Sequence, residues 1–147
     1  MSTASVRIDQ VGTVFVPVID QDRSLRFYVE KLGFEKRSDF PYGAGRWLEV
    51  APPGSAHRVA LVPLGEGRSG EGRSGDGRRT YCAFETQNID ETHVALRNVS
   101  VAVSDIARKG KERNGLFSEA VTIPDPVPPQ FFFRDPDGNQ FLIVEVR

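Results

Sequence analysis

Short runs of alternating hydrophobic and polar residues recur along the chain and predict a protein rich in strands. The run TVFVPV at 13–18 has valine at every second position, the period of a strand with two different faces. A helical stripe of hydrophobic residues follows at Leu25, Tyr28, Val29 and Leu32. Asp20 and Asp22 are candidate N-caps before this stripe and Gly33 ends it, so the pattern predicts a helix here.

The same pattern returns in the second half of the chain. Residues 81–96 align with residues 13–28 without a gap: a strand, a helix N-cap at Asn88 or Asp90, and then a helical stripe. The stripe consists of Ile89, His93 and Leu96. The repeat predicts two halves of similar structure.

A second pair of segments supports the repeat. Residues 47–54 align with residues 131–138, and each segment is followed by another strand-like run. Each half is therefore predicted as strand, helix, strand, strand, strand. The remaining strand lies at 33–40 in the first half and around 116–123 in the second half.

The turn DPDGN at 135–139 predicts a hairpin between the last two strands. Proline fixes φ, glycine accepts positive φ, and the aspartates can bond to nearby backbone. The segment 65–79 has a different character, because it consists of glycine, serine and charged residues and contains EGRSG twice. Such composition predicts a flexible linker.

Composition and charge exclude several classes of protein. The net charge of −1 gives no general attraction for nucleic acid, and no run is long and apolar enough to span a membrane. The basic stretch at 108–113 is short and is interpreted as a solvated loop. A single cysteine, Cys82, cannot form an intramolecular disulfide, and the N-terminus lacks the apolar segment of a secretion signal. We expect a cytoplasmic protein.

The paired halves, the strand-to-helix entry DQDRSLRFYVEKLGF and the ending FRDPDGNQFLIVE resemble the vicinal oxygen chelate superfamily. This superfamily includes glyoxalases, bleomycin-resistance proteins and extradiol dioxygenases. The resemblance implies an α+β fold, in which two βαβββ modules form a cupped mixed β-sheet with helices on the convex face, commonly in a homodimer. It implies a single domain over 1–147, with modules at about 8–64 and 80–147 joined by the linker at 65–79. It does not imply one reaction.

The resemblance also implies where metal ligands would lie in members that use a metal. Transferring those positions gives Thr13, Tyr81, Leu142 and a residue near Ala60, none of which is a good ligand. His57 is interpreted as a loop residue and His93 as part of the inward helical stripe. The sequence thus predicts no metal site and no cofactor.

Alternation along the strands predicts which residues line the cavity of the cup. The concave face should contain Thr13, Phe15, Tyr81, Ala83, Glu85, Gln140, Leu142 and Val144. The middle strands, with Trp47 and Glu49 in one half and Phe131, Phe132 and Phe133 in the other, leave open which alternate set faces inward. The candidate ligand-binding residues are Thr13, Phe15, Trp47, Tyr81, Glu85, Phe132 and Leu142.

Two classes of function follow from this cavity. The favoured hypothesis is a metal-free protein that binds an apolar or aromatic small molecule, as the drug-sequestering members of the resembled superfamily do. The alternative is an enzyme of that superfamily, a lyase or a dioxygenase-type oxidoreductase. A metal-free enzyme would use Glu49 or Glu85 as general base and Tyr81 as acid or oxyanion donor. The sequence does not decide between binding and catalysis.

Overall fold

The structure is a computed structural model that describes residues 5–64, 78–108, 112–113, 121–122 and 127–146. Residues 65–77 of the predicted linker lie outside the described residues. Arg78 and Arg79, its last two residues, belong to a strand instead. In the described segments, no helix is long and apolar enough to cross a membrane.

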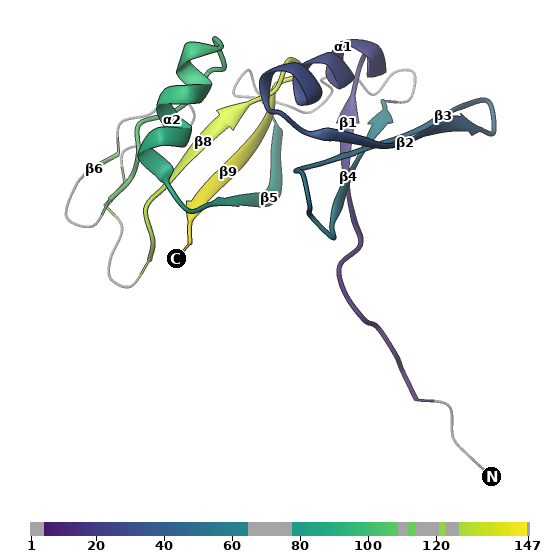
Figure 1. The fold of residues 1–147 in the computed structure, drawn as a ribbon, viewed down its shortest axis with the longest axis horizontal. Coiled ribbons are helices and arrows are strands. Elements are labelled where there is room, and N and C mark those ends of the chain that lie inside the picture. The colour runs from purple at the N-terminus through teal and green to yellow at the C-terminus, as the bar shows by residue number, and fades with distance from the viewer. Residues whose placement is uncertain (1–4, 65–77, 109–111, 114–120, 123–126, 147) are drawn as a thin grey trace.

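The first half forms a mixed sheet (Figure 1). Its strands are β1 (Thr13–Val18), β2 (Glu35–Tyr42), β3 (Gly45–Ala51) and β4 (Arg58–Pro63). They are hydrogen-bonded in the order β1-β4-β3-β2, with β1 parallel to β4 and the other pairs antiparallel. The predicted succession of strand, helix, strand, strand and strand along this half is confirmed.

The helix between β1 and β2 begins where the sequence predicts. Asp20 is the N-cap and its side chain accepts a hydrogen bond from the Arg23 N–H at 3.1 Å. The helix runs as α1 (Gln21–Arg26) and continues as the π-helical segment η1 (Phe27–Lys31), and Gly33 follows with φ of 75°. Val29 of the predicted hydrophobic stripe does not pack in the core, because it is 37% exposed.

The second half has a similar but less complete sheet. Within the described residues, β5 (Arg78–Thr86), β9 (Asn139–Glu145) and β8 (Gln130–Arg134) pair in that order. The helix α2 (Ile89–Asn98) follows β5, and its N-cap is Asn88, which accepts a hydrogen bond from the Glu91 N–H at 3.0 Å. The α+β fold class is confirmed.

The strand predicted around 116–123 falls largely outside the part of the chain that the structure describes. Residues 116–120 and 123 lie outside the described residues, and β7 (Val121–Thr122) pairs with β6 (Glu112–Arg113). Two bridges occupy the edge of β8, from Val103 to Phe133 and from Ala107 to Gln130. The chain that follows α2 directly therefore lies beside β8.

The two halves share one hydrophobic core. Tyr28 of the first helix is fully buried, with its ring 6.2 Å from that of Phe141 in β9, and Phe34 lies 5.4 Å from Phe84 in β5. These contacts hold the helical side of the second sheet against the first helix. The opposite faces of the sheets remain outside this core.

Burial shows which alternate residues of the middle strands face the core. Leu48 and Val50 of β3 are buried in the core cluster, as are Phe131 and Phe133 of β8. Trp47 and Phe132 are only half-buried and lie on the other faces of their sheets. The sequence had left this choice open.

The turn at 135–139 forms the predicted hairpin and also fastens the two halves together. The Asp135 carboxylate accepts hydrogen bonds at 2.8 Å from the Tyr28 hydroxyl and from the Asn139 side-chain amide. The Asp137 carboxylate accepts from the Ile19 N–H at 2.8 Å and the Ser24 hydroxyl at 2.8 Å. We call Asp135, Asp137 and Asn139 the hairpin clamp.

Candidate functional site

The open face of the first sheet carries a cluster of aromatic rings. The Phe15 ring of β1 lies 5.9 Å from that of Trp47 in an edge-to-face arrangement, across the intervening strand β4. The Tyr42 ring, on the neighbouring strand β2, lies 5.7 Å from that of Trp47. Phe15 is 63% exposed and Tyr42 is 67% exposed. Phe40, opposite Trp47 in the β2–β3 register, is 44% exposed. We call these four residues the aromatic face.

A hollow of 220 Å³ adjoins the aromatic face and gives it depth. Tyr42 and Trp47 line it from β2 and β3, and Ala60 and Val62 line it from β4. Small side chains on β4 therefore leave space beside the tryptophan ring. An exposed group of aromatic rings next to such a space is suited to a flat apolar ligand.

A buried carboxylate lies on the same face as the aromatic rings. Glu49 is 3% exposed and accepts a hydrogen bond from the Thr13 hydroxyl at 3.2 Å. The Arg58 guanidinium lies 3.5 Å from its other oxygen. Burial alone would raise the pKa of Glu49, but hydrogen bonds from Ser38, Trp47 and Thr13 and the charge of Arg58 hold it below its ordinary value. The Glu49 carboxylate is thus occupied by these hydrogen bonds and by Arg58, and it is a weak base.

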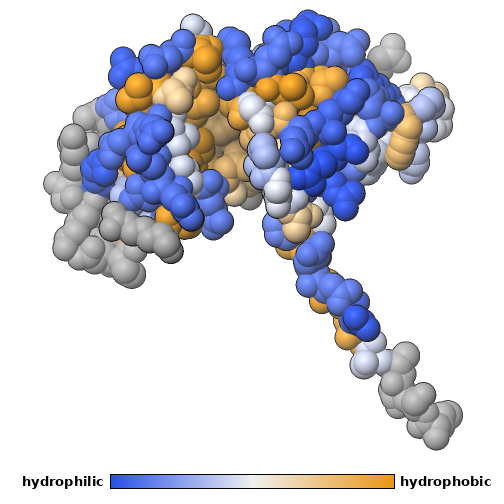
Figure 2. Space-filling model, in the orientation of Figure 1, coloured by the Kyte–Doolittle hydropathy of each residue, from blue (hydrophilic) through white to orange (hydrophobic). Residues whose placement is uncertain are grey.

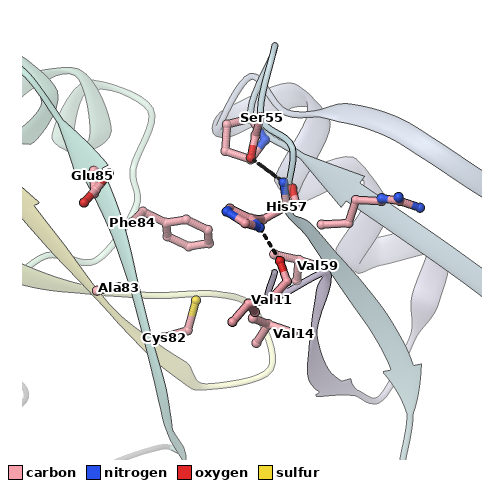
Figure 3. Close-up of a pocket in the computed structure, with 11 residues that line it drawn as sticks. Val11, Val14, Ser55, His57, Val59, Cys82, Ala83, Phe84 and Glu85 are labelled. Atoms are coloured by element: carbon pink, nitrogen blue, oxygen red, sulfur yellow. Dashed lines mark hydrogen bonds between the residues drawn. The ribbon is translucent and has the colours of Figure 1, made fainter. Parts of the chain in front are cut away.

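A larger cleft of 580 Å³ separates the two halves (Figure 3). Its apolar lining comes from Val14 of β1, Val59 of β4 and Phe84 of β5. Figure 2 shows a recess with hydrophobic residues between the halves. Arg58 and Glu85 contribute opposite charges to the lining. This cleft is distinct from the hollow beside Trp47, because the two linings share no residue.

His57 holds the wall of this cleft in place. Its Nδ1 contacts the Val11 carbonyl, and its backbone N–H donates to the Ser55 hydroxyl at 3.1 Å. Its ring and that of Phe84 project into the cleft from opposite sides (Figure 3). Cys82 also lines the cleft, but burial raises the pKa of its thiol, so the reactive thiolate is disfavoured.

The structure brings the first-half candidate residues together. Thr13, Phe15 and Trp47 share the open face of the first sheet, and Glu49, named as a catalytic candidate, lies beneath them. Sequence reasoning missed Tyr42 and Arg58. Tyr42 follows a proline in what looks like a turn. Arg58 is the first residue of the strand-like run at 58–63, and nothing in the pattern assigns it a role.

The second-half candidates lie on a separate sheet. Leu142 is the register partner of Phe132 on one side and of Ala83 on the other. Glu85 is exposed and lines the cleft. Tyr81 belongs to β5, but its side chain lies outside the described residues. Of the eight residues predicted to share the concave face, Gln140 is almost fully buried.

The positions that correspond to metal ligands in the resembled superfamily do not fit a metal. The Thr13 hydroxyl donates to Glu49, Leu142 offers no donor atom, and Ala60 is a buried methyl group. Within the part of the chain that the structure describes, no three His, Cys, Asp or Glu side chains gather closely enough to hold an ion.

Comparison with known proteins identifies the family. A sequence profile of the Glyoxalase/Bleomycin resistance protein/Dioxygenase superfamily matches residues 7–143. The chain belongs to this superfamily. Its membership confirms the resemblance seen in the repeat and in the hairpin turn. The match spans both halves and the segment between them.

Relatives in the superfamily resemble the chain over almost its whole length. The uncharacterized protein YetH of Bacillus subtilis (strain 168) is 30% identical over 139 residues, which cover 94% of this chain and 99% of YetH. TnmS3, an antibiotic binding protein from Streptomyces sp. CB03234, has a crystal structure with a TM-score of 0.71 and 29% identity, covering 97% of this chain and 100% of TnmS3. A superfamily member from Sphaerobacter thermophilus DSM 20745 gives a TM-score of 0.70 at 30% identity, with coverage of 95% and 98%.

Proposed function

We propose that this protein binds an apolar, aromatic small molecule on the aromatic face without a metal. The observation that carries the proposal is the group of rings formed by Phe15, Tyr42 and Trp47, of which Tyr42 and Trp47 line a hollow. Exposed aromatic rings gathered on a sheet face mark an interaction site, because each ring gains from stacking and from removal of its area from water. The likeness to TnmS3, an antibiotic binding protein, supports a ligand of this kind.

The polar groups beside the aromatic face favour binding over catalysis. A general base needs a carboxylate whose pKa lies near the working pH, whereas the hydrogen bonds of Glu49 lower its pKa. Arg58 retains an exposed side chain, 45% accessible, next to Glu49. We infer that Arg58 meets a polar oxygen of the ligand while the rings contact its apolar part. A homodimer and a cytoplasmic location stay predictions.

Titration of tryptophan fluorescence tests this proposal. Trp47 is the sole indole, so its emission reports the aromatic face without interference from other tryptophans. Aromatic drugs and phenolic acids should quench it saturably, whereas cyclohexanecarboxylic acid at equal concentration should not. Phe15→Ala should weaken binding roughly tenfold, because an aromatic pair contributes about 0.5–1.5 kcal/mol beyond area burial.

Val94→Ala is the matched control, because Val94 is 53% exposed and lies on α2, away from the aromatic face. It should bind as tightly as the wild type. Absence of saturable binding over the whole panel, by fluorescence and by calorimetry, would contradict the proposal. Turnover of a thiol adduct or a dihydroxy-aromatic compound in the same assays would support the enzyme alternative instead.

Treatment with a chelator is expected to leave the thermal stability of the protein unchanged. Dialysis against a chelator should not shift the melting temperature, because Thr13 and Leu142 stand at positions where metal-using relatives would need ligands. Leu142→Glu alone should create no tight site, since a single carboxylate supplies too few ligands. Stoichiometric zinc, iron, nickel or manganese in the purified protein, lost together with thermal stability on dialysis, would contradict this prediction.

A further inference from the structure

Strands β3 and β4 pair over a short stretch of their length in the described chain. Their register pairs are Glu49 with Ala60 and Val50 with Val59. Both strands continue beyond these pairs, because β3 pairs with β2 from Gly45 onward and β4 pairs with β1 as far as Pro63. The start of β3 and the end of β4 therefore diverge from each other (Figure 1).

The side chain of Gln21 joins the two strands where they have diverged. Gln21 is the first residue of α1, and its Nε2 donates to the Arg46 carbonyl of β3 at 3.1 Å and to the Leu61 carbonyl of β4 at 2.8 Å. Both partners are acceptors, so the amide nitrogen with its two N–H donors must face them. One side chain thus takes the place of backbone hydrogen bonds between these strands.

The local sequence explains why the pairing stops here. In the same register Arg46 would face Pro63, which has no N–H to donate. Strands β1 and β4 run parallel, and Asp20 caps α1 two residues after β1 ends at Val18. The first turn of α1 therefore lies at the end of β4, within reach of the gap between β4 and β3.

Arg46 is held through its side chain as well as through its carbonyl group. Its guanidinium lies 2.7 Å from the Asp22 carboxylate of α1 and 2.7 Å from the Asp39 carboxylate of β2. Two neighbouring residues of α1, Gln21 and Asp22, thus fix the start of β3. A wall held at its backbone and at a side chain keeps its position without a ligand, which lowers the cost of binding one.

The hollow beside Trp47 coincides with this gap. Its 220 Å³ lie between residues 45–48 of β3 and residues 60–63 of β4. Strands that are fully paired lie about 4.7–4.9 Å apart and leave no room for a ring between them. An apolar cavity of about 150 Å³ holds one benzene molecule, so the hollow suits one substituted aromatic ring.

We propose that Gln21 is a positioning residue of the ligand site, whose amide holds β3 and β4 apart so that one aromatic ring of the ligand enters the hollow beside Trp47. This inference rests on the proposed function and names the part of the ligand that enters the sheet. A ligand with a single substituted ring gains from the gap. A system of three fused rings is too large for the hollow and stays on the aromatic face.

Gln21→Met tests the role of the amide, because methionine has a similar length but no N–H donor. Without the amide, Leu48 and Leu61 can pair and close the gap. Calorimetry with toluene-4-sulfonate and anthraquinone-2-sulfonate compares one ring with three fused rings that carry the same anionic group. The dissociation constant of toluene-4-sulfonate should rise roughly tenfold, and that of anthraquinone-2-sulfonate less than about twofold.

Two further variants separate positioning from a general structural effect. Gln21→Lys restores N–H donors at a similar reach and should return the affinity for toluene-4-sulfonate to within about threefold of the wild type. Arg26→Met places the same new side chain on an exposed residue of the same helix and should change neither dissociation constant. Circular dichroism should show that every variant is folded.

Nuclear magnetic resonance gives a measurement that needs no ligand. Cross-strand nuclear Overhauser contacts between the backbones of Leu48 and Leu61 should appear in Gln21→Met and be absent from the wild type, where these residues are not register partners.

An unchanged ratio of the two dissociation constants in Gln21→Met would overturn the inference, as would a Gln21→Lys variant that binds no better than Gln21→Met. A wild type that binds neither sulfonate, nor any compound of the fluorescence panel, would overturn the proposed function. The resonance comparison would then still show whether Gln21 holds the strands apart, so the two failures can be told apart.

Discussion

Asp135→Ala is expected to lower the free energy of unfolding by about 3–4 kcal/mol. The carboxylate accepts hydrogen bonds from the Tyr28 hydroxyl, from both nitrogens of Asn139 and from the Asp137 N–H, all within 2.9 Å. Alanine leaves these donors without their acceptor in a site where Tyr28 is fully buried and Asp135 is 6% exposed. Chemical denaturation with urea, followed by circular dichroism, measures the loss.

Tyr28→Phe removes a hydrogen bond between the halves but leaves the hydrogen bonds within the hairpin, so it measures the first contribution by itself. Burial, followed by the charge of Asp135, raises the pKa of Tyr28 well above its ordinary value, so the hydroxyl stays protonated and donates. Removing it should cost about 1–3 kcal/mol, less than Asp135→Ala. Asp105→Ala, at an exposed aspartate, should change stability by less than about 0.5 kcal/mol. Equal, small effects of all three substitutions would show that the hairpin clamp does not stabilise the fold.

The hairpin clamp marks the limit of what local pattern predicts. The turn residues at 135–139 predict the hairpin, because proline, glycine and aspartate act on the backbone next to them. The bond from Tyr28 to Asp135 joins residues 107 positions apart, and the bond from Ser24 to Asp137 joins residues 113 apart. Alternation and capping carry no information about such pairs, so the sequence reveals the turn but not its second role.

Which face of a strand packs against the core was predictable where the residues of its two faces differ in kind. Thr13 and Phe15 alternate with the valines of β1, and the structure buries Val16 and Val18 while leaving Phe15 exposed. Phe131, Phe132 and Phe133 offer no such contrast, since all three residues are equally apolar. Only packing against the core decides that Phe131 and Phe133 face inward.

The candidate site was predicted in part for the same reason. Alternation along β1 correctly places Thr13 and Phe15 on the face opposite the core. Tyr42 and Arg58 lie at the candidate site because β2 pairs with β3 and β1 pairs with β4 in a particular register. One sequence taken by itself contains little information on the register between strands that are far apart in the chain. Trp47 was singled out as the sole indole, and its neighbours became known only from the sheet.

The segment after α2 makes a contact that the repeat does not predict. The repeat predicts a strand around 116–123, most of which lies outside the described residues. Val103 and Ala107 reach β8 soon after α2, with Val101 and Ala107 buried. The Ser104 hydroxyl accepts a hydrogen bond from the Phe132 N–H at 2.9 Å. These short bridges supply hydrogen-bond partners for backbone groups at the edge of β8 without forming a regular strand.

Phe141→Ala is expected to destabilise the protein by about 3–5 kcal/mol, the usual cost of removing a buried phenylalanine ring. Phe141 is fully buried, and its ring lies 5.3 Å from that of Phe133 and 5.2 Å from that of Phe84. It also contacts Tyr28 from the first half, so the cavity would open where the two halves meet. Surrounding rings are large and rigid, and they cannot collapse into the space without leaving their rotamers.

Urea denaturation of three variants tests this expectation. Phe141→Leu keeps most of the volume and should cost less than Phe141→Ala, about 1–2 kcal/mol. Phe40→Ala removes the same ring from a residue that is 44% exposed and should cost about 1 kcal/mol or less. If Phe141→Ala were no more damaging than Phe40→Ala, the aromatic stack would not join the halves. A loss of unfolding free energy in the expected range would instead show that the ring cluster next to the hairpin clamp holds the two halves together. This cluster consists of Tyr28, Phe84, Phe133 and Phe141.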